Sequence, residues 1–309
     1  MTGKATSSSR ADTPWRGERM ALVTVATEDY LPGTLVMIDS FLRHNAWFGG
    51  DAVVIHRDLS RTARDALSSI GRGCLFHEVS EELAAKMDAV SVAAGWRSGK
   101  AMQFASIEAF SLEQYDRVIF CDSDLLFLGS IAELGDFDSP LIACGDGAHY
   151  RGNSRRIADF AEIERSVATP DTDCISGTFN SGMMILAPPV LSRANFKSLL
   201  MMMEPDRWAD DATGHTDQML LNLQFAGRYP LAPAQFNFML SHKDLIQKAT
   251  DCTVEQARVL HFTGAAKPWR RFEELASMGL DHEEFAAFAN WRDAYALLER
   301  LIPLDKDHV

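Results

Sequence analysis

Two aspartates separated by a single residue could bind a metal ion. Asp122 is the last residue of the apolar segment RVIFCD (117–122), which we expect to form a buried strand, and Ser123 and Asp124 follow it. In an extended segment, residues two apart point the same way, so both carboxylates can converge on one oxygen-preferring cation. A pair of solvated loop acids that cap the following segment is the structural alternative. The motif alone does not decide between them.

A histidine ends a second apolar segment, ARVLHFTG (257–264). A lone histidine such as His261 is more often structural than a ligand. Gly264 and Lys267 follow it closely, however. Glycine allows a ligand to approach the backbone, and lysine is a point charge suited to phosphate. An imidazole beside carboxylates also extends the choice of metal to transition metals such as manganese.

Two further motifs place polar groups among apolar residues. Asn180-Ser181-Gly182 lies within the apolar segment FNSGMMIL (179–186), where a β-bulge or turn is the structural alternative. Asp217-Gln218 stands at the head of a predicted helix over 214–226, where Asp217 could simply interact with the helix dipole. Each motif taken singly has this simpler explanation.

The elements that must position these residues alternate in type. Apolar segments predict strands over 20–27, 51–56 and 74–79, and helical spacing predicts helices over 34–45 and 61–71. A further helix over 100–115 precedes the strand that carries Asp122. This order predicts an α/β fold with a mostly parallel central sheet flanked by helices. Such sheets collect ligands at the carboxyl ends of their strands.

The remaining chain predicts strands over 140–145, 179–186 and 257–264, and a helix over 196–203. Residues 146–176 are polar, and we expect them to form an excursion that could contact substrate. The tail after Trp269 predicts helices with apolar residues at helical spacing, suited to docking on the domain or on a second subunit. We therefore expect a disordered leader over 1–19, one domain over 20–270 and a helical extension over 271–309.

Composition excludes some classes of function. The formal net charge is -13, which argues against a surface that binds nucleic acid, since that needs a basic stripe. The N-terminal segment lacks the apolar stretch of a signal peptide, and no transmembrane helix is expected. The five cysteines are scattered, without CxxC spacing, so we expect reduced thiols and a cytoplasmic location.

Taken together, the motifs resemble the family-8 glycosyltransferases, which include glycogenin and bacterial galactosyl- and glucosyltransferases of surface polysaccharides. The matching segments are VTVATEDYLPGTLVMIDSFLRHN, EQYDRVIFCDSDLLFLGSIAEL, FNSGMMIL, TDQMLLN and HFTGAAKPW, in that family's order. They span roughly residues 20 to 270. The strand with Asp122 and Asp124 and the HFTG-x-x-KPW block are the most specific parts.

The resemblance implies a GT-A fold, a UDP-sugar donor and retention of anomeric configuration. It implies that Asp122, Asp124 and His261 bind the metal, manganese first and magnesium as the alternative. It implies that Asp217 and Gln218 lie beneath the reacting sugar as the catalytic pair. The residues implied to contact the donor are Thr27, Tyr30, Ser123, Asn180, Gly264 and Lys267. The acceptor could be a glycan, a lipid-linked sugar, a protein or a small molecule.

Two positions depart from the family pattern. The first loop reads Thr27-Glu28-Asp29-Tyr30, one residue tighter than usual, with Glu28 where asparagine is frequent. Ser106 stands where many members carry Lys or Arg, and Lys100 or Gln103 could substitute for it. Two other classes of function remain as alternatives: a non-catalytic nucleotide-sugar binder, and a phosphatase of the haloacid-dehalogenase type, whose first motif would match Asp122.

Overall fold

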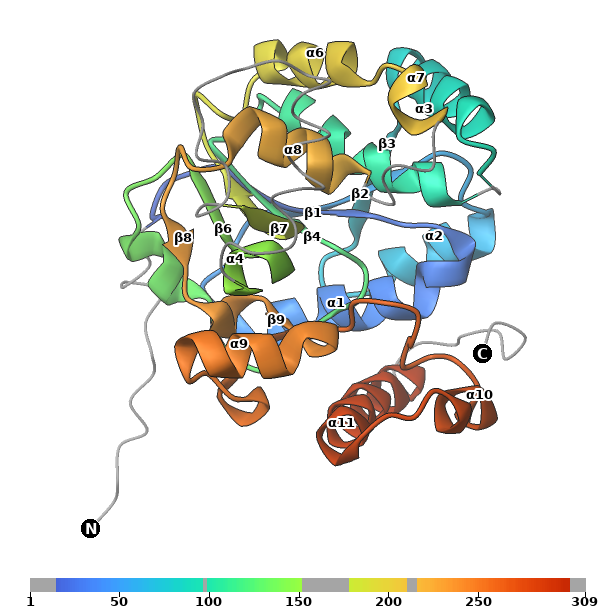
Figure 1. Ribbon diagram of the computed structural model, residues 1–309, viewed down its shortest axis with the longest axis vertical. Helices are drawn as coiled ribbons and strands as arrows, with labels where there is room; N and C mark the ends of the chain where they lie inside the picture. Colours follow the sequence, from blue (N-terminus) through green and yellow to red (C-terminus); the bar gives the residue numbers. More distant parts are fainter. Residues whose placement is uncertain (1–14, 97–98, 152–177, 210–215, 301–309) are drawn as a thin grey trace.

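The computed structural model describes residues 15–96, 99–151, 178–209 and 216–300 (Figure 1). Most of the predicted leader and most of the predicted excursion at 146–176 therefore lie outside the described residues. Trp15 is buried beside Trp47, with ring centroids 5.1 Å apart. Packing of the described chain thus begins at Trp15, ahead of the boundary predicted at Met20, because this indole fills a place in the core.

The central sheet has seven strands in the order β3-β2-β1-β4-β7-β6-β8. β1 pairs in parallel with β2 and β4, and β2 with β3, while β7 runs antiparallel to both of its neighbours. This confirms the prediction of a mostly parallel sheet. The strands are β1 (Met20–Val25), β2 (Asp51–His56), β3 (Cys74–Glu78), β4 (Arg117–Cys121), β6 (Leu141–Gly145), β7 (Phe179–Leu186) and β8 (Leu231–Ala232).

Helices cover both faces of this sheet (Figure 1). Along β1, Leu22 faces one apolar core, while Ala21 and Val23 face the other. A strand buried on both sides needs an unbroken apolar run, which is the pattern seen in the sequence. One face carries α1 (Leu31–His44), α2 (Arg61–Ser68) and α9 (Lys243–Thr250). The other carries α3 (Glu81–Ala93), α6 (Arg193–Met202), α7 (Asp206–Ala209) and α8 (Asp217–Phe225).

A second, three-stranded sheet was not predicted as a sheet. It has the order β5-β10-β9, from β5 (Leu125–Phe127), β10 (Val259–His261) and β9 (Phe238–Met239). β10 runs antiparallel to β5, and the register sets His261 opposite Leu125. Because Asp124 directly precedes Leu125, this pairing brings the histidine to the aspartates.

The helix predicted over 100–115 is a 3-10 helix, η3 (Lys100–Ser111). Every residue from Phe104 to Phe110 is buried. Packing on all sides of the segment outweighs its local preference for an α-helix. The short α4 (Gly147–Arg151) follows β6 and lies in the part of the predicted excursion that the structure describes.

The C-terminal helices pack on their own domain. The predicted helical tail forms two helices, α10 (Phe272–Ser277) and α11 (His282–Glu299), and α11 packs along α1. Trp291 of α11 lies with its ring centroid 5.6 Å from that of Trp269, and Phe288 lies 5.3 Å from Phe262. Of the two docking surfaces expected for the tail, the structure shows the one on the domain. The domain boundary at residue 270 stays a prediction.

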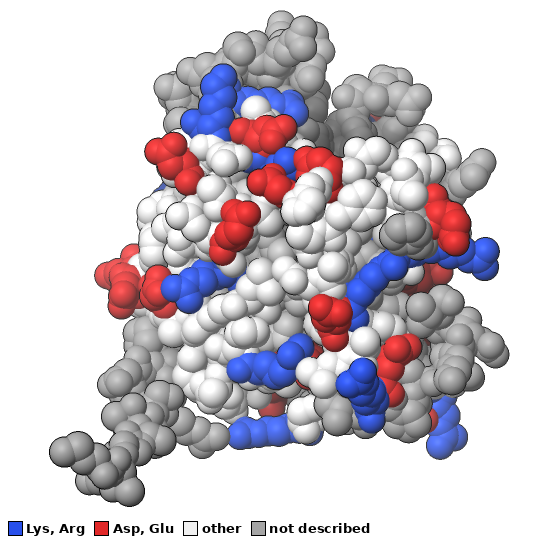
Figure 2. Space-filling view, turned by 90° about the horizontal axis from the view of Figure 1, so that it is seen from below, with Lys and Arg blue, Asp and Glu red and all other residues white. Residues whose placement is uncertain are grey.

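The surface carries charges of both signs. On the face seen in Figure 2, the described Lys and Arg side chains are interspersed with Asp and Glu and form no continuous basic stripe. None of the described helices is both long and apolar enough to cross a bilayer. The four cysteines in the described part of the chain, Cys74, Cys121, Cys144 and Cys252, are all free thiols.

Candidate metal and donor site

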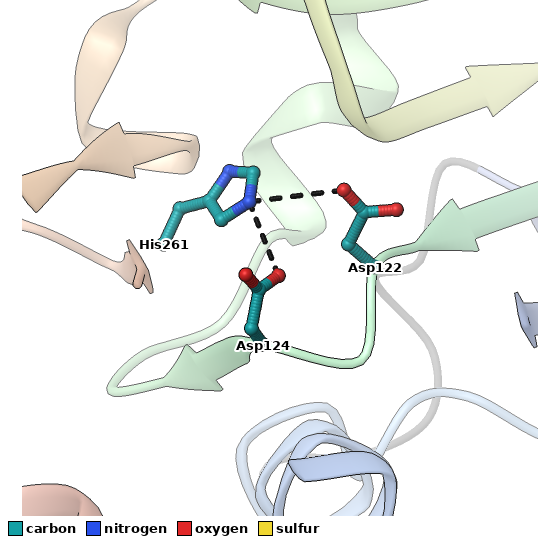
Figure 3. A group of neighbouring side chains, drawn as sticks. All are labelled: Asp122, Asp124 and His261. Carbon is teal, nitrogen blue, oxygen red and sulfur yellow. Dashed lines mark ion pairs between the residues drawn. The ribbon is translucent and has the colours of Figure 1, made fainter. Parts of the chain in front are cut away.

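Three side chains from the two sheets meet at the carboxyl end of β4 (Figure 3). Asp122 follows β4, Asp124 precedes β5, and His261 is the last residue of β10. Nε2 of His261 lies 3.2 Å from Oδ1 of Asp124 and 3.7 Å from Oδ2 of Asp122. Ligand atoms of all three side chains lie within 4.8 Å of one another. The structure thus brings the three predicted metal ligands together.

Gly182 keeps the space beside these ligands open. A Cβ at this position would lie 2.2 Å from Cε1 of His261 and 2.8 Å from Oδ2 of Asp122, so no side chain fits there. The backbone of β7 instead approaches closely, and the amide of Asp122 donates to the carbonyl of Gly182 at 2.7 Å. Two carboxylates and one imidazole suit a divalent cation of the manganese type. The residues present therefore fit such a cation.

Lys267 is buried beside Asp124 and balances its charge. Its ammonium donates to Oδ2 of Asp124 at 2.5 Å and to the carbonyl of Phe262 at 2.7 Å. Burial alone would raise the pKa of Asp124, but His261 and Lys267 outweigh it and hold that pKa well below its usual range. Burial alone would lower the pKa of Lys267, but Asp124, Tyr30 and Asp122 together outweigh burial, and the pKa of Lys267 is raised. This pair stays ionised at neutral pH.

Asp122 differs from Asp124 in the direction of its pKa shift. Its side chain is 41% exposed, and the burial that remains, followed by the negative charge of Asp124, raises its pKa. Asp217 adds to this effect and is itself buried, so its own pKa is raised as well. Neighbouring acids whose ionised forms are disfavoured would be stabilised by a bound cation.

The predicted sugar-contacting residues lie next to each other. Nδ2 of Asn180 on β7 donates to Oε1 of Gln218 at 2.9 Å. Nε2 of Gln218 donates to Oδ2 of Asp146 at 3.2 Å. Asp217 and Gln218 are the first two residues of α8, so both project from its first turn toward the strand ends. The side chains of Asn180 and Gln218 therefore hold each other in place.

Ser106 occupies the position where many family members carry a cation. Its hydroxyl donates to Oδ2 of Asp217 at 2.9 Å, and the hydroxyl of Thr216 lies 3.0 Å from Oδ1. The two suggested substitutes have other partners: the ammonium of Lys100 lies 4.5 Å from the ring centroid of Trp96, and Gln103 accepts from Thr216. The described side-chain partners of the Asp217 carboxylate are therefore hydroxyl groups, and the backbone N–H of Gln218 also bonds to it.

Tyr30 lies at the rim of the same site. Its ring is 38% exposed, contacts Trp269 edge-on with centroids 5.3 Å apart, and lies 5.8 Å from the ammonium of Lys267. Burial raises the pKa of the Tyr30 phenol, so it stays neutral. A partly exposed aromatic face beside a cation is suited to stack on a nucleobase. Its proposed partner in base binding, Thr27, accepts the amide of Tyr30 through its carbonyl at 3.1 Å.

The unusual Glu28 has a structural partner. Its carboxylate accepts the amide of Ser60 at 2.6 Å, and Ser60 is the N-cap residue of α2. This bond fixes the tight first loop against the start of α2. Gly264 lies in the loop after β10, is exposed and has a φ of 88°, which favours glycine. Its backbone is thus open to the approach of a ligand.

Ser123 is buried between the two aspartates. Its hydroxyl donates to the carbonyl of Val25 at 2.6 Å and accepts from Thr34 at 2.9 Å. These bonds tie the end of β1 and the start of α1 to the turn that carries the acids. The structure thus gives this hydroxyl internal partners, and its predicted contact with the donor stays a prediction.

Three residues of the site were missed by sequence reasoning. A Cβ at Gly33 would lie 2.5 Å from the carbonyl oxygen of Ser123, so α1 packs directly on the acidic turn. Oδ1 of Asn237 lies 2.9 Å from Nδ1 of His261, and Asn237 is fully buried. Asp146 follows the apolar strand β6 and is also buried. An acid after an apolar strand is the signal that found Asp122, and it would have found Asp146 too.

A model described as glycosyl transferase family 8 matches residues 21–273, most of the chain. The chain belongs to this family. The match confirms the family predicted from the motifs, and it contradicts the alternative of a haloacid-dehalogenase-type phosphatase. It also extends over both sheets, so the predicted metal ligands and the strands that hold them all fall within the matched region.

Relatives and solved structures agree with this family. A lipopolysaccharide 1,3-galactosyltransferase of Salmonella typhimurium is 25% identical over 179 residues, 56% of this chain and 50% of that protein. Glycogenin-2 of Homo sapiens is 27% identical over 259 residues, 81% of this chain and 43% of that protein. The chain therefore spans about half the length of these relatives.

A similar fold is seen in a crystal structure of the galactosyltransferase LgtC in complex with donor and acceptor sugar analogs. That structure superposes with a TM-score of 0.63 at 20% identity, covering 90% of this chain and 95% of LgtC. At this identity the likeness concerns the fold. The predicted GT-A architecture is thus confirmed.

Proposed function

We propose that this protein transfers a hexose from a UDP-sugar to an acceptor and that it depends on a divalent metal, manganese first and magnesium as the alternative. The observation that carries the proposal is the convergence of Asp122, Asp124 and His261 on one point. Family membership supports the same chemistry. We further propose that transfer retains the anomeric configuration, through either a covalent intermediate or a front-face attack.

The leaving group explains the need for positive charge. Cleavage of the anomeric bond leaves a nucleoside diphosphate with new negative charge. Asp122, Asp124 and His261 would hold a cation that would supply Lewis-acid stabilisation of that charge. Lys267 adds a second positive charge beside Asp124. Gly264 leaves backbone open to the diphosphate. These residues define the diphosphate part of the proposed site.

The sugar and the base would bind on opposite sides of the diphosphate. Asn180 would contact the sugar, and an oxygen of Asp217 or Gln218 would stabilise the oxocarbenium-like centre as the bond breaks. On the other side, Tyr30 would stack on uracil, next to Thr27. Ser123 completes the predicted donor contacts.

The acceptor is proposed to be a saccharide. This rests on the relative that is named a lipopolysaccharide 1,3-galactosyltransferase, to which the chain is similar. A lipid-linked sugar, a protein and a small molecule remain the alternatives. We also propose a cytoplasmic location, because the described cysteines are free thiols.

Donor hydrolysis without an acceptor tests this function. A panel of uridine and guanosine diphosphate sugars is incubated with manganese, magnesium or a chelator, and the released nucleotide is measured. We expect release from one uridine diphosphate sugar, dependent on the metal. Silence across the panel, together with a thermal shift on adding UDP and manganese, would make the protein a non-catalytic binder. Silence without any thermal shift would refute the donor site itself.

A further inference from the structure

A chain of hydrogen bonds links the metal ligand His261 to the sugar side of the site. Nδ1 of His261 lies 2.9 Å from Oδ1 of Asn237. Nδ2 of Asn237 donates to Oδ1 of Asn180 at 2.8 Å, and Nδ2 of Asn180 donates to Oε1 of Gln218. The chain ends where Gln218 donates to Asp146. Asn237 is thus the link between the two halves of the site.

The direction of every bond in this chain follows from two fixed groups. The backbone N–H of Gly182 can only donate, and it meets Oδ1 of Asn180 at 3.0 Å. The amide of Asn180 therefore has its oxygen toward Gly182 and Asn237 and its nitrogen toward Gln218. At the far end, the carboxylate of Asp146 accepts from the nitrogen of Gln218. Both ends impose the same polarity on the amides between them.

This polarity sets the hydrogen on the imidazole. Because Asn180 presents an oxygen, Asn237 must turn its nitrogen to Asn180 and its oxygen to His261. An amide oxygen only accepts, so Nδ1 of His261 carries a hydrogen. Nε2, which faces Asp122 and Asp124, is then the nitrogen that offers a lone pair to a cation. Metal-bound histidines commonly have such a partner on the other nitrogen.

We propose that Asn237 is a positioning residue with two separable tasks: its oxygen selects the His261 tautomer that binds the cation, and its nitrogen holds Asn180 for the donor sugar. The inference rests on the proposed function. Asn237 is fully buried, and so are its neighbours in sequence, Phe236 and Phe238. An apolar side chain at this position would avoid the free-energy cost of burying a polar group. Asparagine supplies both an acceptor and a donor at this short reach.

Two substitutions separate the tasks. Asn237→Leu removes both bonds, and Asn237→Asp keeps the acceptor for His261 but presents an oxygen to Asn180. Mn²⁺ affinity is measured without donor, from the electron paramagnetic resonance signal of free Mn²⁺. We expect Asn237→Leu to bind Mn²⁺ about 10- to 100-fold more weakly. We expect Asn237→Asp to bind Mn²⁺ at least as well as the wild type, yet to lose about tenfold or more of its donor hydrolysis at saturating Mn²⁺.

Asn45→Leu is the matched control. Asn45 is equally buried at the end of α1 and makes four hydrogen bonds or close polar contacts, none to a residue of the site. It should lower the melting temperature and leave Mn²⁺ affinity unchanged. Unchanged Mn²⁺ affinity in folded Asn237→Leu would overturn the inference, and so would an equal loss of Mn²⁺ affinity in both Asn237 variants.

A measurement on the wild-type chain covers the case in which the Asn237 variants fail to fold. The ¹⁵N resonances of His261 are recorded with bound Mg²⁺ and assigned by their loss in His261→Gln. A hydrogen on Nδ1 supports the inference, and a hydrogen on Nε2 alone overturns it. If the wild type bound no divalent cation at all, the metal site of the proposed function would fail first, and the inference with it.

Discussion

The fold shifts the pKa of the buried acid Glu108 in one direction and the pKa values of two acids at the candidate metal site, Asp122 and Asp217, in the other. Glu108 lies on η3 and is 2% exposed. It accepts from the amide and the hydroxyl of Ser80 and from the hydroxyl of Ser111, and His77 lies 3.5 Å away. Burial alone would raise its pKa, but the hydrogen bonds from His77 and Ser80 outweigh burial and lower that pKa. Its ionised form is fully satisfied within the chain.

At the metal site the balance is different. The pKa of Asp122 is raised because burial and the charge of Asp124 outweigh the opposing effects of His261 and Lys267. The pKa of Asp217 is raised because burial outweighs the hydrogen bonds that its carboxylate accepts. Ser106 and Glu108 are two residues apart on η3, so one segment serves both regions. This chain can therefore supply a buried acid such as Glu108 with hydrogen-bond donors that outweigh its burial. At the strand ends, by contrast, the donors do not outweigh the burial of Asp122 and Asp217, and a bound cation would stabilise their ionised forms.

The largest expected effect is loss of activity when either metal-binding acid is neutralised. Asp122→Asn and Asp124→Asn each remove one carboxylate ligand, and metal stabilisation of the leaving group contributes several kcal/mol. We expect metal-dependent donor hydrolysis to fall by more than about a hundredfold in both variants. Released nucleotide measured at saturating donor checks this. Near wild-type turnover in either variant would remove that residue from the metal site.

The same two variants should differ in stability when no metal is present. Asp124→Asn leaves the buried ammonium of Lys267 without its carboxylate, at a cost of about 3 kcal/mol. Asp122→Asn removes a charge whose folded-state pKa is raised. Because this side chain is 41% exposed, solvent screening limits the gain to at most about 1 kcal/mol. Urea unfolding at pH 8 with chelator measures both. Equal destabilisation by the two would contradict the assigned difference between these acids.

Glu108→Gln should produce the opposite combination. In the wild type, Ser80 and Ser111 donate hydrogen bonds to the two carboxylate oxygens. The NH₂ group of glutamine would replace one of these acceptors with a donor, which should lower the free energy of unfolding by about 1–3 kcal/mol. We expect lower stability in urea with unchanged Mn²⁺ affinity. A large fall in Mn²⁺ affinity would show that Glu108 and the metal site are coupled, and would contradict their treatment as separate regions.

The smallest effect concerns pH. The folded-state pKa of Glu108 is lowered below its unfolded value of about 4.3. Its contribution to stability is therefore present above that unfolded value and is lost as the pH falls through the folded-state value. The stability difference between the wild type and Glu108→Gln should shrink from pH 6 to pH 3 in urea unfolding. A difference that grew toward acid would reverse the sign of the shift.

Much of the fold could be predicted from the sequence because long apolar runs mark strands buried on both faces. The runs at 51–56 and 179–186 coincide with β2 and β7. The helix α3 was not predicted, although Ser80 and two glutamates mark its start. The three metal ligands were predicted from strand ends together with the family resemblance.

The small sheet could not be predicted in the same way. β5 and β9 have three and two residues, too short to show a period of two, and β9 joins the sheet only through its pairing with β10. Asn237 was missed for the same reason, since it lies just before β9. Its one visible signal was a polar residue between two phenylalanines. Partnership with His261 arises only when the strands pair.

Anomalous diffraction at the manganese edge tests the central claim most directly. Crystals of the wild-type protein would be soaked with Mn²⁺ and UDP, and the anomalous difference density would be calculated. We expect one strong peak within bonding distance of Asp122, Asp124 and Nε2 of His261. A fully occupied peak elsewhere, or UDP bound in the site without any peak at these three residues, would contradict it.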